Sequence, residues 1–233
     1  PWVEPIEPAA PTADVSKMTR TYSNLIPVLA TLLGFAALGC ESGGVGDPCT
    51  PEDEYLQDFN GFAVSEVNIE SKSFQCETRV CIVNHFQGRV SCPYGQTEAD
   101  IASITDPTNG KRCRVPGTDG SNVIEGVNID EIRVPVEPQF KARSATDTVY
   151  CSCRCAGPDP NARYCECPSG YECAELVKEI GLGKEQLAGS YCVKAGTVYN
   201  PQSSPAPQLC VYGQADPKCT ETGENPPLDT KSE

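Results

Sequence analysis

Cysteine is the residue type with the greatest chemical potential in this sequence. The chain of 233 residues contains 15 cysteines but one histidine. Thiols at this density form disulfides in oxidising compartments or bind metal ions as thiolates. The close pairs within 151–155 and 165–167 could contribute to such a thiolate cluster. However, the sequence has no Cys-x-x-Cys pair, no haem-attachment motif and no second histidine for a mixed zinc site. We therefore expect disulfides, with no metal and no cofactor.

The first forty residues have the features of a targeting segment rather than of a folded domain. Residues 1–17 are proline-rich, and we exclude them as an upstream, non-native segment, with Met18 as the expected start. Arg20 then precedes a stretch from Thr21 to Gly39 that holds no charged residue. A short positive region followed by a short apolar region that ends in small residues is typical of a secretory signal peptide. A transmembrane anchor is the alternative, but no basic cluster follows the apolar stretch.

The end of this segment, Ala37-Leu38-Gly39-Cys40, resembles the lipobox of bacterial lipoproteins. Gly39 and Cys40 match that motif, whereas Ala37 and Leu38 stand where the family has a leucine and a small residue. The resemblance implies cleavage before Cys40 and lipid attachment to its sulfur. It also implies a bacterial cell-envelope location, facing the periplasm or the cell surface. Glu41, where the inner-membrane retention signal has Asp, favours the outer membrane.

The cysteine count agrees with lipidation of Cys40. Fifteen is odd, and an unpaired cysteine in a secreted protein needs an explanation. Removing Cys40 leaves an even set, from which we expect seven disulfides in an oxidising envelope. The fourteen remaining residues are Cys49, Cys76, Cys81, Cys92, Cys113, Cys151, Cys153, Cys155, Cys165, Cys167, Cys173, Cys192, Cys210 and Cys219.

Parity also predicts one feature of the covalent topology. Five of these cysteines precede residue 150 and nine follow it, so at least one bridge must join the two groups if all pair within the chain. Cysteines two residues apart rarely reach bridging geometry with each other. We therefore predict that Cys151, Cys153 and Cys155 bond to separate partners, and we expect these partners on both sides of their strand.

The pattern of apolar residues predicts a mainly β, disulfide-rich fold of short strands and hairpins with long loops and one short helix. Alternating or β-branched runs predict strands, and Leu176, Val177 and Ile180 have helical spacing over 174–180. Residues 78–83 and 88–92 are expected to form a hairpin. The other predicted strands cover 62–69, 129–136, 147–155, 190–194 and 208–212.

These segments give a domain plan. After the signal peptide at 18–39, residues 40–48 are expected to form a flexible polar tether, and residues 49–219 a disulfide-rich β region. That region could divide into lobes at 49–145 and 146–219, linked by at least one bridge. Residues 220–233 lack apolar content and are expected to be disordered.

The loop between the strands of the expected hairpin is the candidate binding site. It places the histidine, His85, beside Phe86 and near Arg89, and aromatic and arginine side chains dominate many interfaces. The alternative is structural: Phe86 packs back onto the hairpin and Arg89 pairs with a nearby carboxylate. Two groups of turn residues, Asp106 with Asn109 and Asp119 with Asn122, lack the spacing of an EF-hand calcium loop.

The net charge and the absence of catalytic motifs exclude several classes of function. A net charge of −14 excludes a general nucleic-acid binder. No nucleophile elbow or zinc-protease motif is present, so we predict no enzymatic activity. Residues 150–192 resemble uncharacterised cysteine-rich bacterial lipoproteins, for which no chemistry is known. The sequence thus favours a lipid-anchored envelope protein with a binding or structural role, attached to the membrane by its lipid and contacting an unidentified envelope protein or polymer. The alternatives are a secreted subunit of a surface assembly, or a secreted enzyme.

Overall fold

Short antiparallel strands dominate the structure, a computed structural model that describes residues 43–102, 112–125, 127–179, 187–201 and 208–220. The predicted signal peptide, the segment before it and Cys40 lie outside these residues, as does nearly all of the predicted disordered tail. Within the described residues, none of the helices has the length and apolar character needed to cross a bilayer. The mainly β, disulfide-rich fold class is confirmed.

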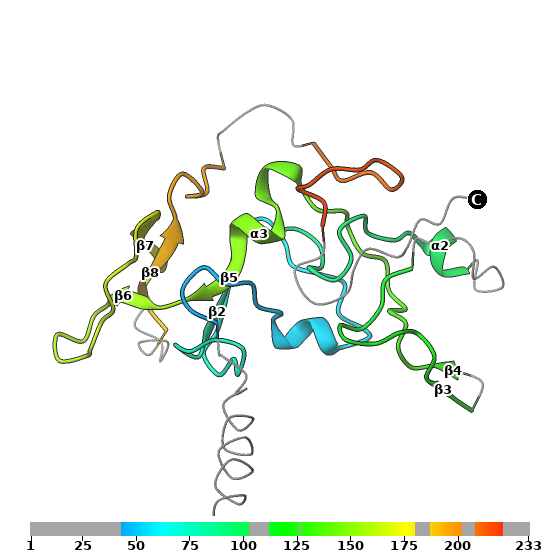
Figure 1. Ribbon diagram of the computed structural model, residues 1–233, viewed down its shortest axis with the longest axis horizontal. Coiled ribbons are helices and arrows are strands. Elements are labelled where there is room, and N and C mark those ends of the chain that lie inside the picture. The colour runs from blue at the N-terminus through cyan, green and yellow to red at the C-terminus, as the bar shows by residue number, and fades with distance from the viewer. Residues whose placement is uncertain (1–42, 103–111, 126, 180–186, 202–207, 221–233) are drawn as a thin grey trace, which may run out of the picture. The chain divides into compact units, whose positions relative to one another are not determined.

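Three small sheets make up the described fold (Figure 1). The first has the order β1-β2-β5, formed by Val67–Glu70, Val80–Asn84 and Val149–Ser152. The second is a hairpin of β3, Val123–Ile124, and β4, Val127–Asn128. The third has the order β6-β8-β7, formed by Arg154–Ala156, Gly189–Lys194 and Tyr171–Val177. The helical turns are short: η3 Glu52–Tyr55, α2 Glu98–Ala102, η4 Lys141–Arg143 and α3 Ala145–Thr148.

Strand β2 is the centre of the core because both of its faces are buried. Cys81 and Val83 point into a cluster that includes Phe62, Phe86 and Val90. Ile82, on the opposite face, joins a second cluster with residues of β5, β7 and β8, among them Tyr150, Tyr171, Tyr191 and Val193. A strand buried on both faces reads as a continuous apolar run, as Val80 to Val83 does.

The expected hairpin of 78–83 with 88–92 is wrong. Strand β2 pairs instead with β1, Val67 opposite Asn84, and with β5, Cys81 opposite Cys151. The chain turns away at His85, whose φ is 51°. Gly88 exchanges two backbone hydrogen bonds with Phe62, 2.9 and 3.0 Å long. Residues 78–83 do contain a strand, but it pairs with β1 and β5 rather than with residues 88–92.

The expected helix over 174–180 is also wrong, because residues 171–177 form strand β7. Cys173 lies opposite Cys192 of β8, and the backbone ladder between these strands fixes an extended conformation. A register shift between Glu175 and Val177 lets the adjacent Leu176 and Val177 both pack against the second core cluster. Tertiary pairing therefore overrides a helical spacing that rested on three residues.

Two other predicted strands survive only in part. Within 129–136, Ile132 and Val136 are buried with Val134 packed beside them, as the alternation predicted, but only isolated bridges form, at Glu131 and Val136. The segment 208–212 likewise contributes one isolated bridge, between Leu209 and Phe140. Elsewhere, β1 is shorter than predicted, and the strand expected over 147–155 is split into β5 and β6.

The seven disulfides join all fourteen cysteines from Cys49 to Cys219. Cys76–Cys151 connects the two groups that parity required to be connected. Cys151, Cys153 and Cys155 bond to three separate partners, as predicted, but they do not lie in one strand, because the strand breaks at Cys153 between β5 and β6. The remaining pairs are Cys49–Cys81, Cys92–Cys113, Cys167–Cys192 and Cys210–Cys219.

Three of these disulfides, which include cysteines of the third sheet, are stacked against one another. One sulfur of Cys167–Cys192 lies with those of Cys153–Cys165 in a group whose atoms are all within 4.8 Å, and its other sulfur lies with those of Cys155–Cys173 in a similar group. The bridge Cys167–Cys192 therefore lies between the other two. Through Cys155–Cys173 this stack links β6 covalently to β7, and through Cys167–Cys192 it links β8 to the segment before β7.

Cutting the chain at the exposed Arg133 tests the crossing bridge, since Cys76–Cys151 is the one described disulfide that spans this residue. After limited tryptic cleavage there, the two fragments should remain joined on a denaturing gel until reductant is added. The double variant Cys76→Ala/Cys151→Ala should release them without reductant. Separation of the unreduced native fragments, with no free thiol detected, would contradict this connectivity.

Candidate functional site

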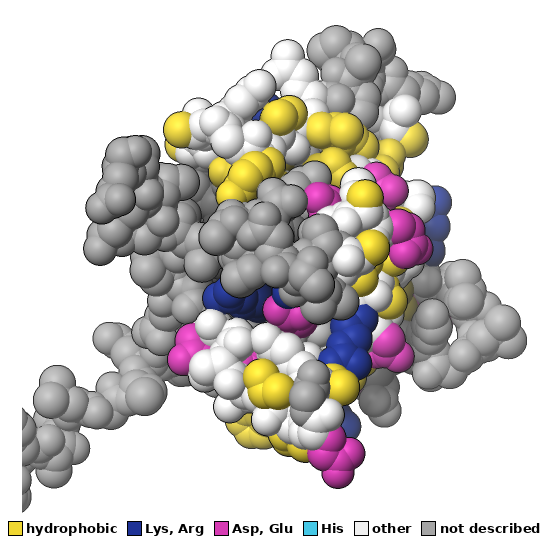
Figure 2. All heavy atoms as spheres, turned by 90° about the vertical axis from the view of Figure 1, so that its right-hand side faces the viewer, with side chains coloured by type: hydrophobic (Ala, Val, Ile, Leu, Met, Phe, Trp, Pro, Cys, Tyr) yellow, Lys and Arg dark blue, Asp and Glu magenta, His cyan; other side chains and the backbone are white. Residues whose placement is uncertain are grey.

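The β3–β4 hairpin exposes more aliphatic surface than its size explains. Val123 is 59% exposed, Ile124 57% and Val127 42%. The strands turn through Glu125, whose φ of 51° suits the left-handed backbone of a tight hairpin. Figure 2, turned so that the side carrying this hairpin faces the reader, shows hydrophobic side chains interspersed with charged ones. A hairpin with apolar residues on both faces leaves a surface that a binding partner could cover.

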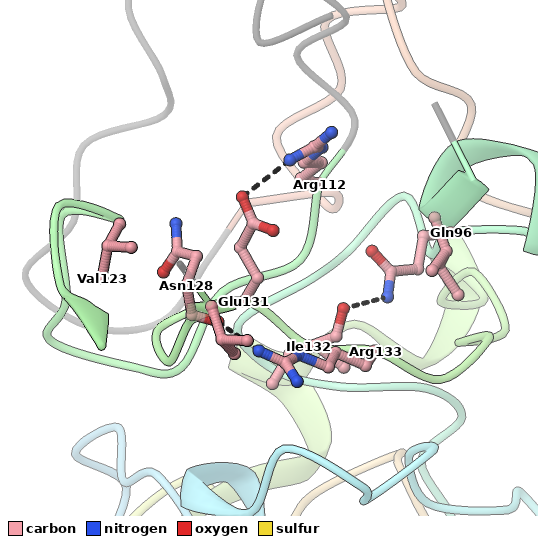
Figure 3. A pocket seen from close by; sticks show the side chains of 9 residues that line it. Gln96, Arg112, Val123, Asn128, Glu131, Ile132 and Arg133 are labelled. Atoms are coloured by element: carbon pink, nitrogen blue, oxygen red, sulfur yellow. Dashed lines mark hydrogen bonds and ion pairs between the residues drawn. The ribbon is translucent and has the colours of Figure 1, made fainter. Parts of the chain in front are cut away.

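A cleft of about 420 Å³ opens beside this hairpin (Figure 3). Val123, Val127 and Asn128 line it from the hairpin, and Ile101 lines it from helix α2. The segment 131–133 supplies the rest of the described wall together with Gln96 and Arg112. Its volume lies within the range of about 300–1,000 Å³ that is usual for small-molecule sites.

The floor of the cleft is held rigidly by the buried amide of Gln96. Its Nε2 donates to the carbonyl oxygens of Ile132, at 3.0 Å, and Val134, at 2.8 Å. Its Oε1 accepts a hydrogen bond from the backbone N–H of Cys113. Beneath this network, the disulfide Cys92–Cys113 packs in a small cluster with Ile132 and Val136. The floor is thus formed before any ligand arrives.

The charged groups of the cleft differ in how they are satisfied. Arg112 forms an ion pair of 2.7 Å with Glu131, so these two charges largely neutralise each other. The guanidinium of the exposed Arg133 donates from Nη2 to the carbonyl oxygen of Asn128. Within the described part of the chain, Arg133 has no carboxylate partner. One positive charge at the cleft therefore remains available to a ligand.

Side chains at the base of the hairpin are engaged with one another. Asn122 donates from Nδ2 to the buried carboxylate of Asp130, and Asp119 accepts from the backbone N–H of Ser121. Hydrogen bonds from Ser121 lower the pKa of Asp119. Asp119 and Asn122 therefore act as turn residues here, whereas Asp106 and Asn109 lie outside the described residues.

The predicted binding loop turns two of its three candidate residues into the interior. Phe86 and Arg89 are both fully buried, and Phe86 belongs to the first core cluster. The structural alternative holds for both residues, since Arg89 pairs with the carboxylate of Glu54. Of the three candidate residues, only His85 is partly exposed. A loop rich in aromatic and arginine residues has the same sequence pattern whether its side chains contact a partner or pack in the core.

The buried pair of Arg89 and Glu54 organises the surrounding loops. Arg89 Nε lies 3.4 Å from Glu54 Oε2, and both side chains are 0% exposed. The Arg89 guanidinium also donates to the carbonyl oxygens of Glu54, Leu56 and Phe59. Glu54 in turn accepts from the backbone of Val90 and from Ser91, while burial raises the pKa of its carboxyl. One ion pair thus fixes η3 and the chain that follows it against residues 89–91.

His85 lies at the edge of the same region. Its Nδ1 is 2.9 Å from the carbonyl oxygen of Val64, and its ring stacks on Tyr199 with centroids 4.1 Å apart. Arg143 donates to the carbonyl oxygens of His85, Asn84 and Thr197. Burial lowers the pKa of His85, and the positive charge of Arg143 lowers it further. These contacts fasten the segment after β8 to the end of β2.

Three groups of cysteine sulfurs are close enough together to suggest metal ligands. All nine cysteines in these groups are engaged in disulfides rather than present as thiolates. Metal coordination by cysteine requires the thiolate. Their proximity therefore reflects the stacking of neighbouring disulfides.

The cleft residues were missed in the sequence although a signal was present. Val123-Ile124-Glu125-Gly126-Val127 places a glycine turn between aliphatic residues, which is a hairpin pattern. The contributions of Ile101, Arg112 and Arg133 depend on how distant loops meet. Comparison with known proteins adds no assignment, because no family model, curated protein or solved structure matches the chain.

Replacing Arg89 with methionine should lower the free energy of unfolding by about 3–5 kcal/mol, because it leaves Glu54 buried without its counter-charge. Phe86→Ala should cost a similar amount by opening a cavity in the core. Arg163→Met, at an exposed site, is the matched control and should change stability by less than about 0.5 kcal/mol. Denaturant unfolding with the disulfides intact measures all three. A loss below about 1 kcal/mol for Arg89→Met would refute the structural role of the pair.

His85 should titrate below its ordinary pKa of 6.5. A base with a depressed pKa in the folded state favours its neutral form, so its stabilising effect is present above pH 6.5 and is lost as the pH falls through the folded-state pKa. With one histidine in the chain, its imidazole NMR signals follow the titration directly. His85→Gln should remove this part of the pH dependence of unfolding. An imidazole that titrates at 6.5 or above would count against the packing described here.

Proposed function

We propose that this chain is a lipid-anchored, disulfide-rich protein of the bacterial cell envelope with a binding or structural role. The observation that carries the proposal is the pairing of all fourteen cysteines from Cys49 to Cys219 with one another. None of them is available to Cys40. Cys40 therefore has no partner among these cysteines, and acylation at the lipobox-like sequence would account for its thiol.

The disulfide framework itself fits an extracellular or envelope role. Such bridges form and persist in oxidising compartments and are rare where glutathione and thioredoxin keep thiols reduced. The short strands and small core clusters leave much of the stability to these bridges. A protein built in this way suits the outside of the cell.

The start of the described chain supports attachment close to a membrane. Gly43 exchanges backbone hydrogen bonds with Gln75 and Glu77, and residues 46 and 47 bond to Cys151. The segment 43–48, expected to belong to a flexible tether, is therefore fixed to the folded body. Only Glu41 and Ser42 separate Cys40 from Gly43. An extended link of three residues spans at most about 10 Å, so a lipid on Cys40 would hold this body near the bilayer surface.

A binding or structural role is favoured over catalysis by the states of the reactive residues. The described cysteines are all oxidised in disulfides, and His85 is engaged with Val64 and Tyr199. The cleft beside β3–β4 contains aliphatic walls, one ion pair and one arginine with spare donors. These groups suit recognition rather than the activation of a nucleophile.

The full chain expressed in a bacterial host with labelled fatty acid tests the anchoring. The native protein should incorporate the label and gain the corresponding mass, whereas Cys40→Ser should incorporate none and should keep its uncleaved signal segment. Ser42→Ala is the matched control and should be labelled like the native protein. Cys40→Ser should still show no free thiols, because it keeps all fourteen partners. A native protein without lipid would overturn the proposal.

A further inference from the structure

We propose that the cleft beside the β3–β4 hairpin binds a small amphiphile that combines an aliphatic chain with one carboxylate, the chemistry of a medium-chain fatty acid. The aliphatic walls of the cleft would cover the chain, and the guanidinium of Arg133 would bind the carboxylate. This inference rests on the cleft alone and does not depend on lipidation of Cys40.

The apolar part of the ligand follows from the walls. Ile101, Val123, Val127 and Ile132 line the cleft, and the two valines remain 59% and 42% exposed. Ile132 is buried in the floor. Covering exposed aliphatic surface of this kind is favourable in rough proportion to the area removed from water. A flexible alkyl chain can follow such an open wall without demanding hydrogen-bonding partners from it.

The carboxylate of the proposed ligand is inferred from Arg133. A guanidinium carries five N–H donors in a planar fork that matches a carboxylate. Arg133 uses Nη2 to bind the carbonyl oxygen of Asn128, which orients the group and leaves the other nitrogens for a ligand. Arg112 is already neutralised by Glu131, so the net attraction is that of one positive charge. The cleft therefore suits one carboxylate rather than a polyanion.

The rest of the molecule argues against two larger partners. The net charge of −14 repels polyanions and anionic membrane surfaces. Insertion of the hairpin tip into a bilayer would bury the exposed Glu125, which lies at the turn between β3 and β4. An intramembrane carboxylate is costly. A small ligand that enters the cleft from the side avoids both penalties.

Preorganisation allows this open cleft to bind without folding around its ligand. Gln96 ties Cys113, Ile132 and Val134 together, and the disulfide Cys92–Cys113 braces the same segment. A wall that is already ordered loses little conformational freedom on binding. Figure 3 shows Gln96 joined to the Ile132 carbonyl and Arg133 joined to Asn128.

Calorimetric titration of the oxidised full chain with dodecanoate, below its micelle concentration, tests the proposal. Dodecanoate should bind at least about tenfold more tightly than dodecanol, which lacks the carboxylate, and dodecyltrimethylammonium should not compete. Arg133→Gln should weaken dodecanoate binding by about tenfold and leave dodecanol binding unchanged. Arg163→Gln, which alters an exposed arginine elsewhere in the chain, is the matched control and should change neither.

A second pair of variants tests the aliphatic wall. Val123→Asp should weaken binding of both dodecanoate and dodecanol, whereas Val198→Asp, at a residue that is 54% exposed, should weaken neither. Unchanged thermal unfolding and absence of free thiols confirm that each variant is folded. Equal binding of dodecanoate to Arg133→Gln and the native protein would overturn the proposal. So would the absence of dodecanoate binding, or binding of neutral phospholipid vesicles in its place.

Discussion

The disulfide Cys76–Cys151 is the constraint on which most of the fold depends. It ties the segment before β2 to β5, two parts of the chain that are 75 residues apart in sequence. Beside it, Cys49–Cys81 fastens the first described residues to β2. Strands of four or five residues have few ladder hydrogen bonds, so their alignment relies on these bridges and on the core they enclose. In the chain-entropy model, bridges across such long loops restrict the unfolded state most.

Buried charge provides the second level of organisation. Arg89 and Glu54 lie in a fully buried pair whose remaining hydrogen bonds reach η3, the loop after it and residues 90–91. Burial of such a pair costs desolvation free energy. Its net contribution to stability therefore depends on hydrogen bonds to nearly all of its polar groups. Here the carbonyl oxygens that Arg89 binds belong to the short turn η3 and the loop after it, which form no β-ladder. The pair therefore takes the place of secondary structure in ordering these loops.

The described surface around the cleft combines rigidity with exposure. The disulfide Cys92–Cys113 and the amide of Gln96 hold the cleft floor, while the β3–β4 hairpin presents aliphatic side chains to solvent. Recognition residues commonly lie on loops that a rigid scaffold positions. The loop from His85 to Arg89 has the opposite role, because the side chains of Phe86 and Arg89 are buried in the interior.

Cysteine number and spacing determined that at least one bridge joins the two groups and that the Cys-x-Cys triplet does not pair internally, whereas the individual pairs came from the structure. Apolar runs located most strands, since burial on a sheet leaves a local pattern. Only the tertiary structure decided that β2 pairs with β1 and β5, that 171–177 is a strand, and that Phe86 and Arg89 face inward. It also brought Ile101, Arg112 and Arg133 to one cleft. The physical reason is that strand partners, counter-charges and cleft walls come from distant segments, whose meeting no local sequence pattern encodes.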